Sequence, residues 1–509
     1  MKRRLISLFL AALMILSLAA CTGNQETTGE TIEGAHVKVV TLSHPSWPMD
    51  GTRKVWEYIR EGTGADVEVQ AIPSTDFYTK VSLMYADPES LPDVMAFDSK
   101  TITDRYSGQG ALIALDDVAE YMPEYNAFIE KLPEEEARSI VDTRKAIDGK
   151  VYYAPVYGRD RMQGVRAWLY REDIFKKHNL AIPNNQEELF EVSRELKKLY
   201  PDSYPFSLRN GLNFISMIGP LWKPYFTYEP YYDYNSEKWS YGATEPTMLE
   251  IIKFYRQMLD EKLIPSDFLT INAKTWEELV ITGRGFIFPD YQVRIDFFTP
   301  LAKSQTPEFS LKAMVPPIMN EETGSHNLGK FNLDPYGLVL CNTKDEARIR
   351  NAARYLDWMY SDEAQELLSW GKEGETFEVV DGKRVYITDE NGSQPNTLYG
   401  FALAGTSTRF DPEAVDAFES ELIAEARKVT LEYVEDNVNP TMWLAFSDEE
   451  SEIISQEGTA MRTYAKEMIS KFVLGQSPIS EFDNFVSTLN DMGAEKLLSV
   501  YTAAYDRVK

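Results

Sequence analysis

The amino-acid sequence predicts an α/β protein with an α-rich C-terminal third. Apolar strand-like runs alternate with helical segments near the N-terminus, amphipathic helices recur in the middle, and long helical stretches follow residue 410. Strands that alternate with helices are typical of βαβ units around a parallel sheet.

In the first hundred residues, strands are expected at 36–42, 67–72 and 91–97, and helices at 51–62 and 77–85. The first strand reads HVKVVTL, and the first helix carries Val55, Trp56 and Ile59 on one face. These apolar residues are typical of an amphipathic helix.

The middle of the chain repeats the pattern less regularly. Asn184 or Asn185 can cap a helix whose apolar residues recur at a spacing of three or four. The further expected elements are strands at 168–170 and 285–288, a loop or hairpin region at 218–241, and helices at 248–260, 347–368, 411–435 and 449–474.

Residues 1–20 predict a cleaved export signal. Three positive residues precede the uncharged run Leu5–Ala20, which is shorter than the roughly 20 residues of a membrane-spanning helix. The run ends Leu18-Ala19-Ala20-Cys21, which resembles the lipobox of bacterial lipoproteins. That resemblance implies a diacylglyceryl group on the Cys21 thiol, and two acyl chains, such as palmitate, anchor a protein stably. We therefore expect a lipid-anchored protein on the extracellular face of the cell membrane.

A polar tether and a strongly acidic body follow the signal. Residues 21–35 are rich in Gly, Thr and Glu and reach roughly 20 Å as a flexible chain. Loss of the signal's three positive charges takes the formal net charge from −28 to −31. This charge and the lack of a basic patch argue against nucleic acid as a partner. Cys341 is the only other cysteine, so no intramolecular disulfide is expected.

Catalytic and metal motifs are missing from the sequence. The four histidines form no HExxH pair, and neither a GxSxG elbow nor a GxxxxGK[ST] loop occurs. Residues 200–206 and 233–244 offer too few oxygen ligands, or the wrong residues, for a calcium loop. The sequence predicts no catalytic residues, no metal site and no cofactor.

Several stretches together resemble one family. They are DGKVYYAP at 148–155, YRED at 170–173, the segment 239–268, GRGFIF at 283–288, WGKEGETFEVVDG at 370–382 and the C-terminal segment 482–507. In this order they resemble the family 1 extracellular solute-binding proteins, the sugar-capturing components of ABC importers. The larger lipoprotein branch of Gram-positive bacteria is the most similar, and maltose-binding and alginate-binding proteins are relatives.

The resemblance implies a two-lobed, periplasmic-binding-protein-like fold with hinge crossings. Lobe 1 would comprise residues 36–160 and 318–372, and lobe 2 residues 161–317 and 373–509, with crossings near 155–165, 313–320 and 372–395. It implies a monomeric, non-enzymatic receptor that closes on an oligosaccharide and delivers it to ABC permease subunits. An anchored glycan hydrolase, or an adhesin or sensor on the same fold, remains an alternative.

Ligand-binding residues are expected at the carboxyl ends of strands, where open α/β sheets bind ligands. Trp47 follows the first strand. The resemblance adds three pairs: Phe97 with Asp98, Trp222 with Tyr225, and Asp290 with Tyr291. Aromatic planes stack on the CH faces of sugars, and carboxylates accept bonds from their hydroxyls.

Three further candidates have alternative interpretations. Arg159 and Arg161 either grip hydroxyls or one carboxylate of the ligand, or lie in a solvated turn. Trp370 either caps a terminal sugar or packs beneath its helix. The remaining aromatics of 222–241 are expected to cover the core of lobe 2.

Overall fold

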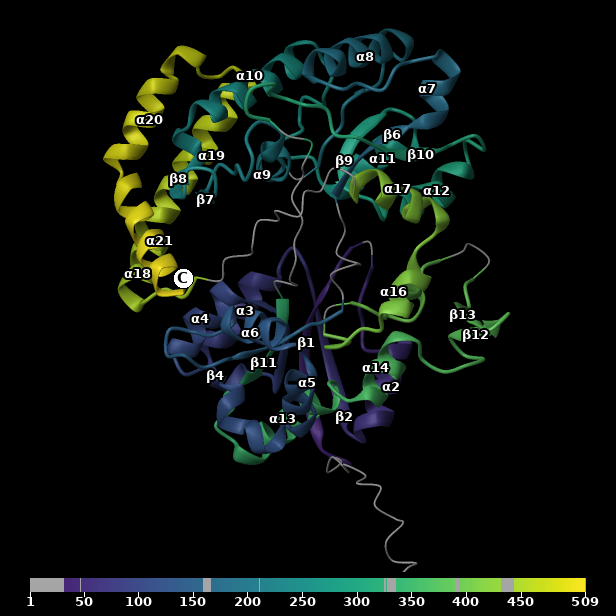
Figure 1. The fold of residues 1–509 in the computed structure, drawn as a ribbon, viewed down its shortest axis with the longest axis vertical. Coiled ribbons are helices and arrows are strands. Elements are labelled where there is room, and N and C mark those ends of the chain that lie inside the picture. Colours follow the sequence, from purple (N-terminus) through teal and green to yellow (C-terminus); the bar gives the residue numbers. More distant parts are fainter. Residues whose placement is uncertain are drawn as a thin grey trace, which may run out of the picture.

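The computed structural model describes residues 32–508 apart from 46, 159–165, 210, 325, 327–335, 390–392, 404 and 432–443. The signal and nearly all of the tether lie outside these residues, as do Cys21, Arg159 and Arg161. The described elements form two lobes, which Figure 1 shows one above the other. No described helix is long and apolar enough to cross a membrane.

Lobe 1 is built on a sheet with the strand order β2-β1-β3-β11-β4, and β5 also pairs with β11. The strands are β1 (His36–Ser43), β2 (Asp66–Pro73), β3 (Val94–Ser99), β4 (Leu112–Ile113), β5 (Tyr153–Pro155) and β11 (Tyr336–Cys341). β1 runs parallel to β2 and β3, as expected, whereas β11 is antiparallel to all of its neighbours. The prediction of parallel strands therefore holds for β1, β2 and β3 but not for β11.

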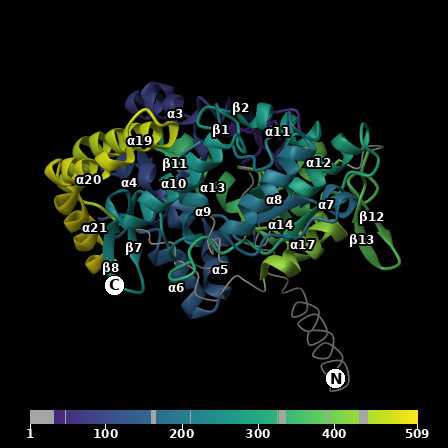
Figure 2. The same cartoon turned by 90° about the horizontal axis from the view of Figure 1, so that it is seen from above.

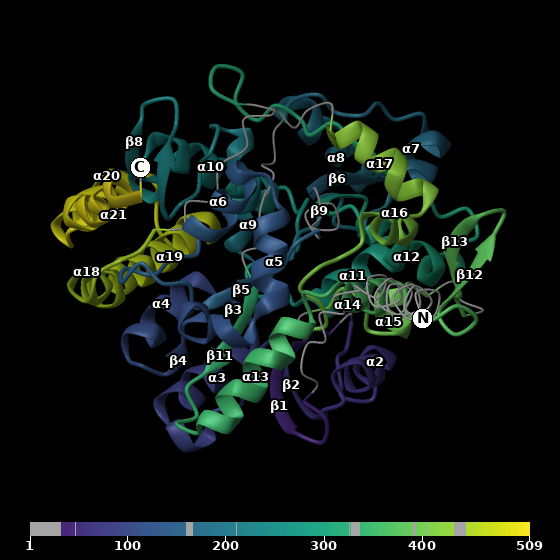
Figure 3. The ribbon, with the colours of Figure 1, turned by 60° about the horizontal axis from the view of Figure 1, so that its bottom comes forward.

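Both faces of the first sheet are covered. Val39 of β1 belongs to one apolar cluster and Val40 to another, because successive side chains point to opposite faces. The helices of this lobe include α2 (Lys54–Thr63), α3 (Phe77–Ala86), α4 (Lys100–Gly108), α5 (Pro123–Lys131), α6 (Glu134–Asp142), α13 (Glu346–Trp358) and α14 (Asp362–Ser369). Figure 3 shows α13 beside the sheet. The single helix expected at 347–368 is divided between α13 and α14.

Lobe 2 has a three-stranded sheet of order β10-β6-β9, with all neighbours antiparallel. Its strands are β6 (Arg166–Arg171), β9 (Ile287–Tyr291) and β10 (Leu311–Met314). Trp168 and Leu169 enter different apolar clusters on the two faces. The surrounding helices include α7 (Glu172–His178), α8 (Gln186–Leu199), α9 (Asn213–Ile218), α10 (Pro246–Asp260), α11 (Ala273–Ile281) and α12 (Arg294–Lys303). The 218–241 region contains the hairpin β7 (Pro230–Asp233) and β8 (Lys238–Tyr241).

The C-terminal third is helical, as expected. Its elements are α15 (Pro395–Leu398), α16 (Pro412–Phe418), α17 (Glu421–Leu431), α18 (Asp448–Ile453), α19 (Thr459–Leu474), α20 (Phe482–Asp491) and α21 (Ala494–Val508). A π-helical turn joins α18 to α19, so the helix expected at 449–474 is present. The one expected at 411–435 is divided between α16 and α17. Figure 2 shows α19–α21 at one end of the molecule.

The lobe assignment of residues 377–418 differs from the prediction. The hairpin β12 (Phe377–Val380) and β13 (Lys383–Tyr386) packs with Trp370 in the core of lobe 1, and Phe418 of α16 joins the same cluster. Ile423 of α17 belongs to a cluster of lobe 2. The chain therefore changes lobe between α16 and α17, later than the crossing expected near 372–395.

Gly158 lies where the chain leaves lobe 1 toward lobe 2. Its neighbour Tyr157 exchanges backbone hydrogen bonds with Thr408 and Phe410, which tie the crossing to the later segment of lobe 1. Gly158 has a φ of 84°, and a Cβ there would lie 2.4 Å from the Phe410 carbonyl oxygen. Glycine is therefore required at this exit point.

Candidate functional site

Two sets of strand ends supply the candidate site. In lobe 1, β1 ends at Ser43 and is followed by His44 and Trp47. In lobe 2, β9 ends at Tyr291, and Arg166 at the start of β6 is its register partner. Burial lowers the pKa of His44, and the charges of Arg294 and Arg209 of lobe 2 lower it further, so the two strand ends lie within electrostatic reach of each other.

Asp290 is the centre of an ion-pair cluster in lobe 2. Its carboxylate is 1% exposed and accepts hydrogen bonds from Arg209 Nε at 2.5 Å and Nη2 at 2.8 Å. Arg294 Nε lies 3.7 Å from the same carboxylate, and Arg294 Nη1 lies 2.7 Å from Glu277. The indole of Trp276 lies beneath both guanidinium groups. The buried carboxylate of Asp290 is therefore held between two guanidinium groups at the end of β9.

Tyr291 presents an aromatic surface beside this cluster. Its residue is 36% exposed, the largest exposure among the predicted site residues whose side chains the structure describes. The guanidinium of Arg166 lies 5.5 Å from the centre of its ring, and that of Arg209 lies 6.0 Å away. Such an edge offers a stacking plane and fixed hydrogen-bond donors together.

His44 and Trp47 form the corresponding pair in lobe 1. Their ring centroids lie 4.9 Å apart, and both residues are half-buried. Burial, followed by the positive charges of Arg294 and Arg209, lowers the pKa of His44 to about 4. The imidazole is therefore neutral at pH 7, with one nitrogen that donates and one that accepts.

Trp222 and Trp370 lie in the cores of their lobes, and each is 1% exposed. The Trp222 ring packs against Phe254 at 5.3 Å. Trp370 stacks on Tyr386 at 4.8 Å and donates from Nε1 to Asp411 at 2.7 Å. Trp370 therefore packs in the core, which is the second of its two interpretations. Trp222 is buried too, so its ring is not exposed for stacking on a sugar in this structure.

Tyr225, Phe97 and Asp98 are the remaining predicted site residues that the structure describes. Tyr225 is half-buried at the edge of the lobe 2 core, has a φ of 68°, and lies 4.9 Å from Tyr234. Phe97 and Asp98 lie at the carboxyl end of β3, and Asp98 is in register with Gly337. The structure describes the backbone of Phe97 and Asp98 but not their side chains.

Four residues of the candidate site were not predicted from the sequence: His44 of lobe 1, and Arg166, Arg209 and Arg294 of lobe 2. His44 lies three residues before Trp47, in the loop that the sequence did single out. Arg209 reaches Asp290 only because residues 206–207 run beside β9. No local motif could have revealed that long-range pairing.

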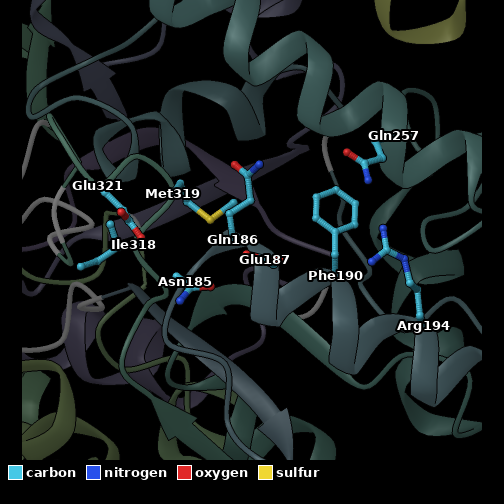
Figure 4. Close-up of a pocket in the computed structure, with 9 residues that line it drawn as sticks. All are labelled: Asn185, Gln186, Glu187, Phe190, Arg194, Gln257, Ile318, Met319 and Glu321. Atoms are coloured by element: carbon cyan, nitrogen blue, oxygen red, sulfur yellow. The ribbon is translucent and has the colours of Figure 1, made fainter.

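A pocket on lobe 2 is a further feature of the described residues. Within the described part of the chain, no group of three His, Cys, Asp or Glu residues could hold a metal ion. A pocket of about 420 Å³ occurs on lobe 2 and contains none of the predicted residues. Figure 4 shows its lining, which comes from α8, α10 and the segment after β10: Asn185, Gln186, Glu187, Phe190, Arg194, Gln257, Ile318, Met319 and Glu321.

Comparisons with known proteins agree with the family expected from the sequence. The family model of the bacterial extracellular solute-binding proteins matches residues 50–366. Lipoprotein LipO of Bacillus subtilis (strain 168) is 21% identical over 535 residues, which cover 100% of this chain and 99% of that protein. The polygalacturonan/rhamnogalacturonan-binding protein YtcQ of the same organism is 20% identical, and the alignment covers 97% of this chain and 96% of YtcQ.

Solved structures share the fold. The alginate-binding protein AlgQ2 without calcium ion matches with a TM-score of 0.75 at 21% identity, over 94% of this chain and 99% of that one. FusA, an ABC-transporter substrate-binding protein of S. pneumoniae in complex with kestose, matches with a TM-score of 0.72 at 17% identity, over 93% and 99%. These similarities confirm the expected two-lobed α/β fold.

Proposed function

Because the chain belongs to the bacterial extracellular solute-binding proteins, we propose that it captures an oligosaccharide between its lobes and delivers it to an ABC transporter permease. The observation that carries this proposal is the placement of polar and aromatic side chains at strand ends of both lobes, Trp47 and His44 on one and Tyr291 on the other. A relative that binds polygalacturonan and a structural neighbour in complex with kestose support a sugar as the solute.

Closure of the lobes is the proposed mechanism. A ligand drives closure only when it makes better contacts in the closed state, which requires contacts to both lobes. Trp47 would cover a sugar ring from lobe 1 while Tyr291 covers one from lobe 2. The neutral imidazole of His44 and the guanidinium of Arg166 would hydrogen-bond the hydroxyls and orient the ligand.

The protein acts as a receptor without turnover, as a monomer on the outer face of the membrane. Its similarity to binding proteins such as AlgQ2 and FusA supports this view over the glycan hydrolase or the adhesin. Lipidation at Cys21 supplies the anchor, and the similarity to Lipoprotein LipO supports it. A permease of the ABC type receives the sugar, as the family implies.

A thermal-shift screen of the soluble body against neutral and acidic oligosaccharides tests this function. Ligand at a hundredfold excess over Kd stabilises the folded state by about 2.7 kcal/mol, which is measurable. We expect a saturable shift with at least one oligosaccharide, which is recovered intact after incubation. Shorter sugars in the recovered sample would favour the hydrolase, and a screen without any shift would contradict the proposed function.

A further inference from the structure

We propose that Asp296 is a latch between the two lobes, a positioning residue that acts on the ligand through the angle of the lobes and not by contact with it. This inference rests on the lobe closure of the proposed function and names a contact that regulates it. Its starting point is the chain crossing between α16 and α17. Figure 1 shows α16 directly below α17 and α12, at the boundary of the two lobes.

The crossing between α16 and α17 is held to lobe 2 by its own two residues, Glu419 and Ser420. The Oγ of Ser420 donates a hydrogen bond to Asp296 Oδ1 of α12 at 2.5 Å and accepts one from the Ile423 N–H of α17 at 3.2 Å. Glu419 forms an ion pair with Arg427 of α17. The point at which the chain changes lobe is therefore fixed to helices of lobe 2.

The second oxygen of the Asp296 carboxylate bonds to lobe 1. Gln394 Nε2 donates a hydrogen bond to Asp296 Oδ2 at 3.3 Å. Gln394 precedes the short helix α15, and the Tyr399 carbonyl oxygen directly after that helix accepts a hydrogen bond of 3.0 Å from the Val55 N–H of α2. Phe401, two residues further on, is part of the lobe 1 core. Gln394 therefore belongs to lobe 1, and its bond to Asp296 joins the lobes.

The Asp296 carboxylate depends on these protein donors because it is partly shielded from water. Asp296 is half-buried, and burial raises its pKa while the hydrogen bonds from Ser420 oppose that rise. A shielded carboxylate that loses a donor has less water to replace it, so the loss costs free energy. Any arrangement of the lobes that takes Gln394 away from Asp296 removes one donor. The bond therefore favours the lobe arrangement of this structure.

Asp296 also belongs to the element that carries the candidate site of lobe 2. Helix α12 begins at Arg294, three residues after Tyr291, and Arg294 Nε lies 3.7 Å from the Asp290 carboxylate. Asp296 lies in the first turn of this helix. The latch and the end of β9 therefore move as one unit relative to lobe 1. A hinge motion that breaks the bond to Gln394 changes the distance between the two halves of the candidate site.

Pulsed EPR on the ligand-free protein measures how the lobes are arranged. Spin labels are attached to the soluble body without Cys21, at Leu83→Cys of α3 in lobe 1 and Leu474→Cys of α19 in lobe 2. Both leucines are exposed, whereas Cys341 is buried and should not be labelled. The helices α3 and α19 lie on the side of the molecule away from α16, so opening at this hinge should lengthen the distance between the labels (Figure 1).

Gln394→Glu places a second carboxylate against Asp296 and should open the lobes. One hydrogen bond changes an equilibrium about two- to tenfold, so we expect the ratio of long to short distances to rise at least about threefold. Gln394→Ala removes the bond without adding a charge and should give a smaller shift of the same sign. Asp296→Asn combined with Gln394→Glu exchanges donor and acceptor. This double variant should return the ratio to that of the wild type.

Gln70→Glu is the matched control, because Gln70 is also a half-buried glutamine of lobe 1 and lies on β2, away from the crossing. It adds the same charge to the same lobe, and the distances should stay those of the wild type. Melting temperatures check that all variants fold. If Gln394→Glu does not fold, Gln394→Ala carries the test.

The experiment uses no ligand, so its outcome is independent of whether a sugar binds. Unchanged distances in the Gln394 variants overturn the latch while the proposed function stands. An equal shift in Gln70→Glu shows an effect of added charge and also overturns it. A double variant that remains as open as Gln394→Glu overturns the pairing of Asp296 with Gln394. A shift in distances together with a failed sugar screen would keep the latch and remove the proposed function.

Discussion

Trp222 packs against Phe254 inside the core of lobe 2, with ring centroids 5.3 Å apart and planes inclined by 69°. The backbone oxygen of Trp222 also accepts a hydrogen bond of 2.7 Å from Thr323 Oγ1. An indole buried in this way contributes to the stability of the lobe. Tyr291, in contrast, is 36% exposed and contributes little to the apolar core. We therefore expect the substitution of Trp222 to lower the stability of the protein and the substitution of Tyr291 to leave it nearly unchanged.

Trp222→Ala should destabilise the protein. Truncation of a fully buried aromatic side chain costs about 3–5 kcal/mol, because apolar burial is lost and a cavity remains. Urea unfolding of the apo protein measures this change, and Tyr291→Ala serves as the exposed control with a loss below about 1 kcal/mol. An unchanged unfolding midpoint for Trp222→Ala would show that the indole is not part of the core.

Tyr291→Ala should weaken sugar binding at least tenfold and leave the apo melting temperature nearly unchanged. The reason is that a stacking ring removes apolar sugar surface from water, at about 25 cal/mol per Å². Calorimetry with a sugar identified in the screen measures the effect. Tyr78→Ala is a suitable control, since Tyr78 is 42% exposed on α3 of lobe 1. Equal losses in both variants would argue against a site at β9.

The pKa of His44 predicts a loss of stability in acid. Its folded pKa of about 4 lies below its ordinary value of 6.5, so the unfolded chain takes up the proton first as the pH falls. Stability should therefore decline between pH 6.5 and 4, by on the order of 2–3 kcal/mol from this group. NMR titration of His44 should give a midpoint near 4. A midpoint near 6.5 would contradict the burial of His44 close to Arg294 and Arg209.

Asp357 predicts a pH dependence of the opposite sign. Burial raises the pKa of this carboxyl to about 7, although it accepts the Tyr125 backbone N–H at 2.9 Å. Below pH 3.8 it is protonated in both states. Between pH 3.8 and 7 the unfolded chain ionises first, so stability falls as the pH rises.

Asp357→Asn should remove this penalty, because the amide oxygen still accepts the N–H bond and carries no charge. We expect a gain on the order of 2 kcal/mol at pH 8 and little change at pH 4. Urea unfolding at both pH values measures it, with Asp362→Asn as a control on the neighbouring helix α14. A gain of equal size at both values would point to a cause other than ionisation.

Cys21→Ala should release the protein from the membrane, because the thiol is the expected attachment point of the acyl chains. Cell fractionation with a high-salt wash distinguishes lipid anchoring from charge attraction. Recovery of the variant in the membrane fraction, in the amount found for wild type, would contradict the anchor.

The sequence by itself determined the local elements of this protein. The valine-rich run HVKVVTL predicted β1, and the apolar residues Val55, Trp56 and Ile59 predicted α2, because each pattern lies within a few neighbouring residues. The Asn185 cap of α8 was predictable for the same reason, and its side chain does accept the Glu188 N–H. The motifs that indicate the family are equally local.

Tertiary structure alone decided which aromatics are buried and which charges meet. Trp222, Trp370 and Tyr291 all looked suitable for stacking on a sugar, yet only Tyr291 remains substantially exposed. The pairing of Arg209 with Asp290 joins residues 81 positions apart. Burial and ion pairing of this kind depend on contacts between distant segments, and a local sequence pattern carries no record of which segments will be brought together.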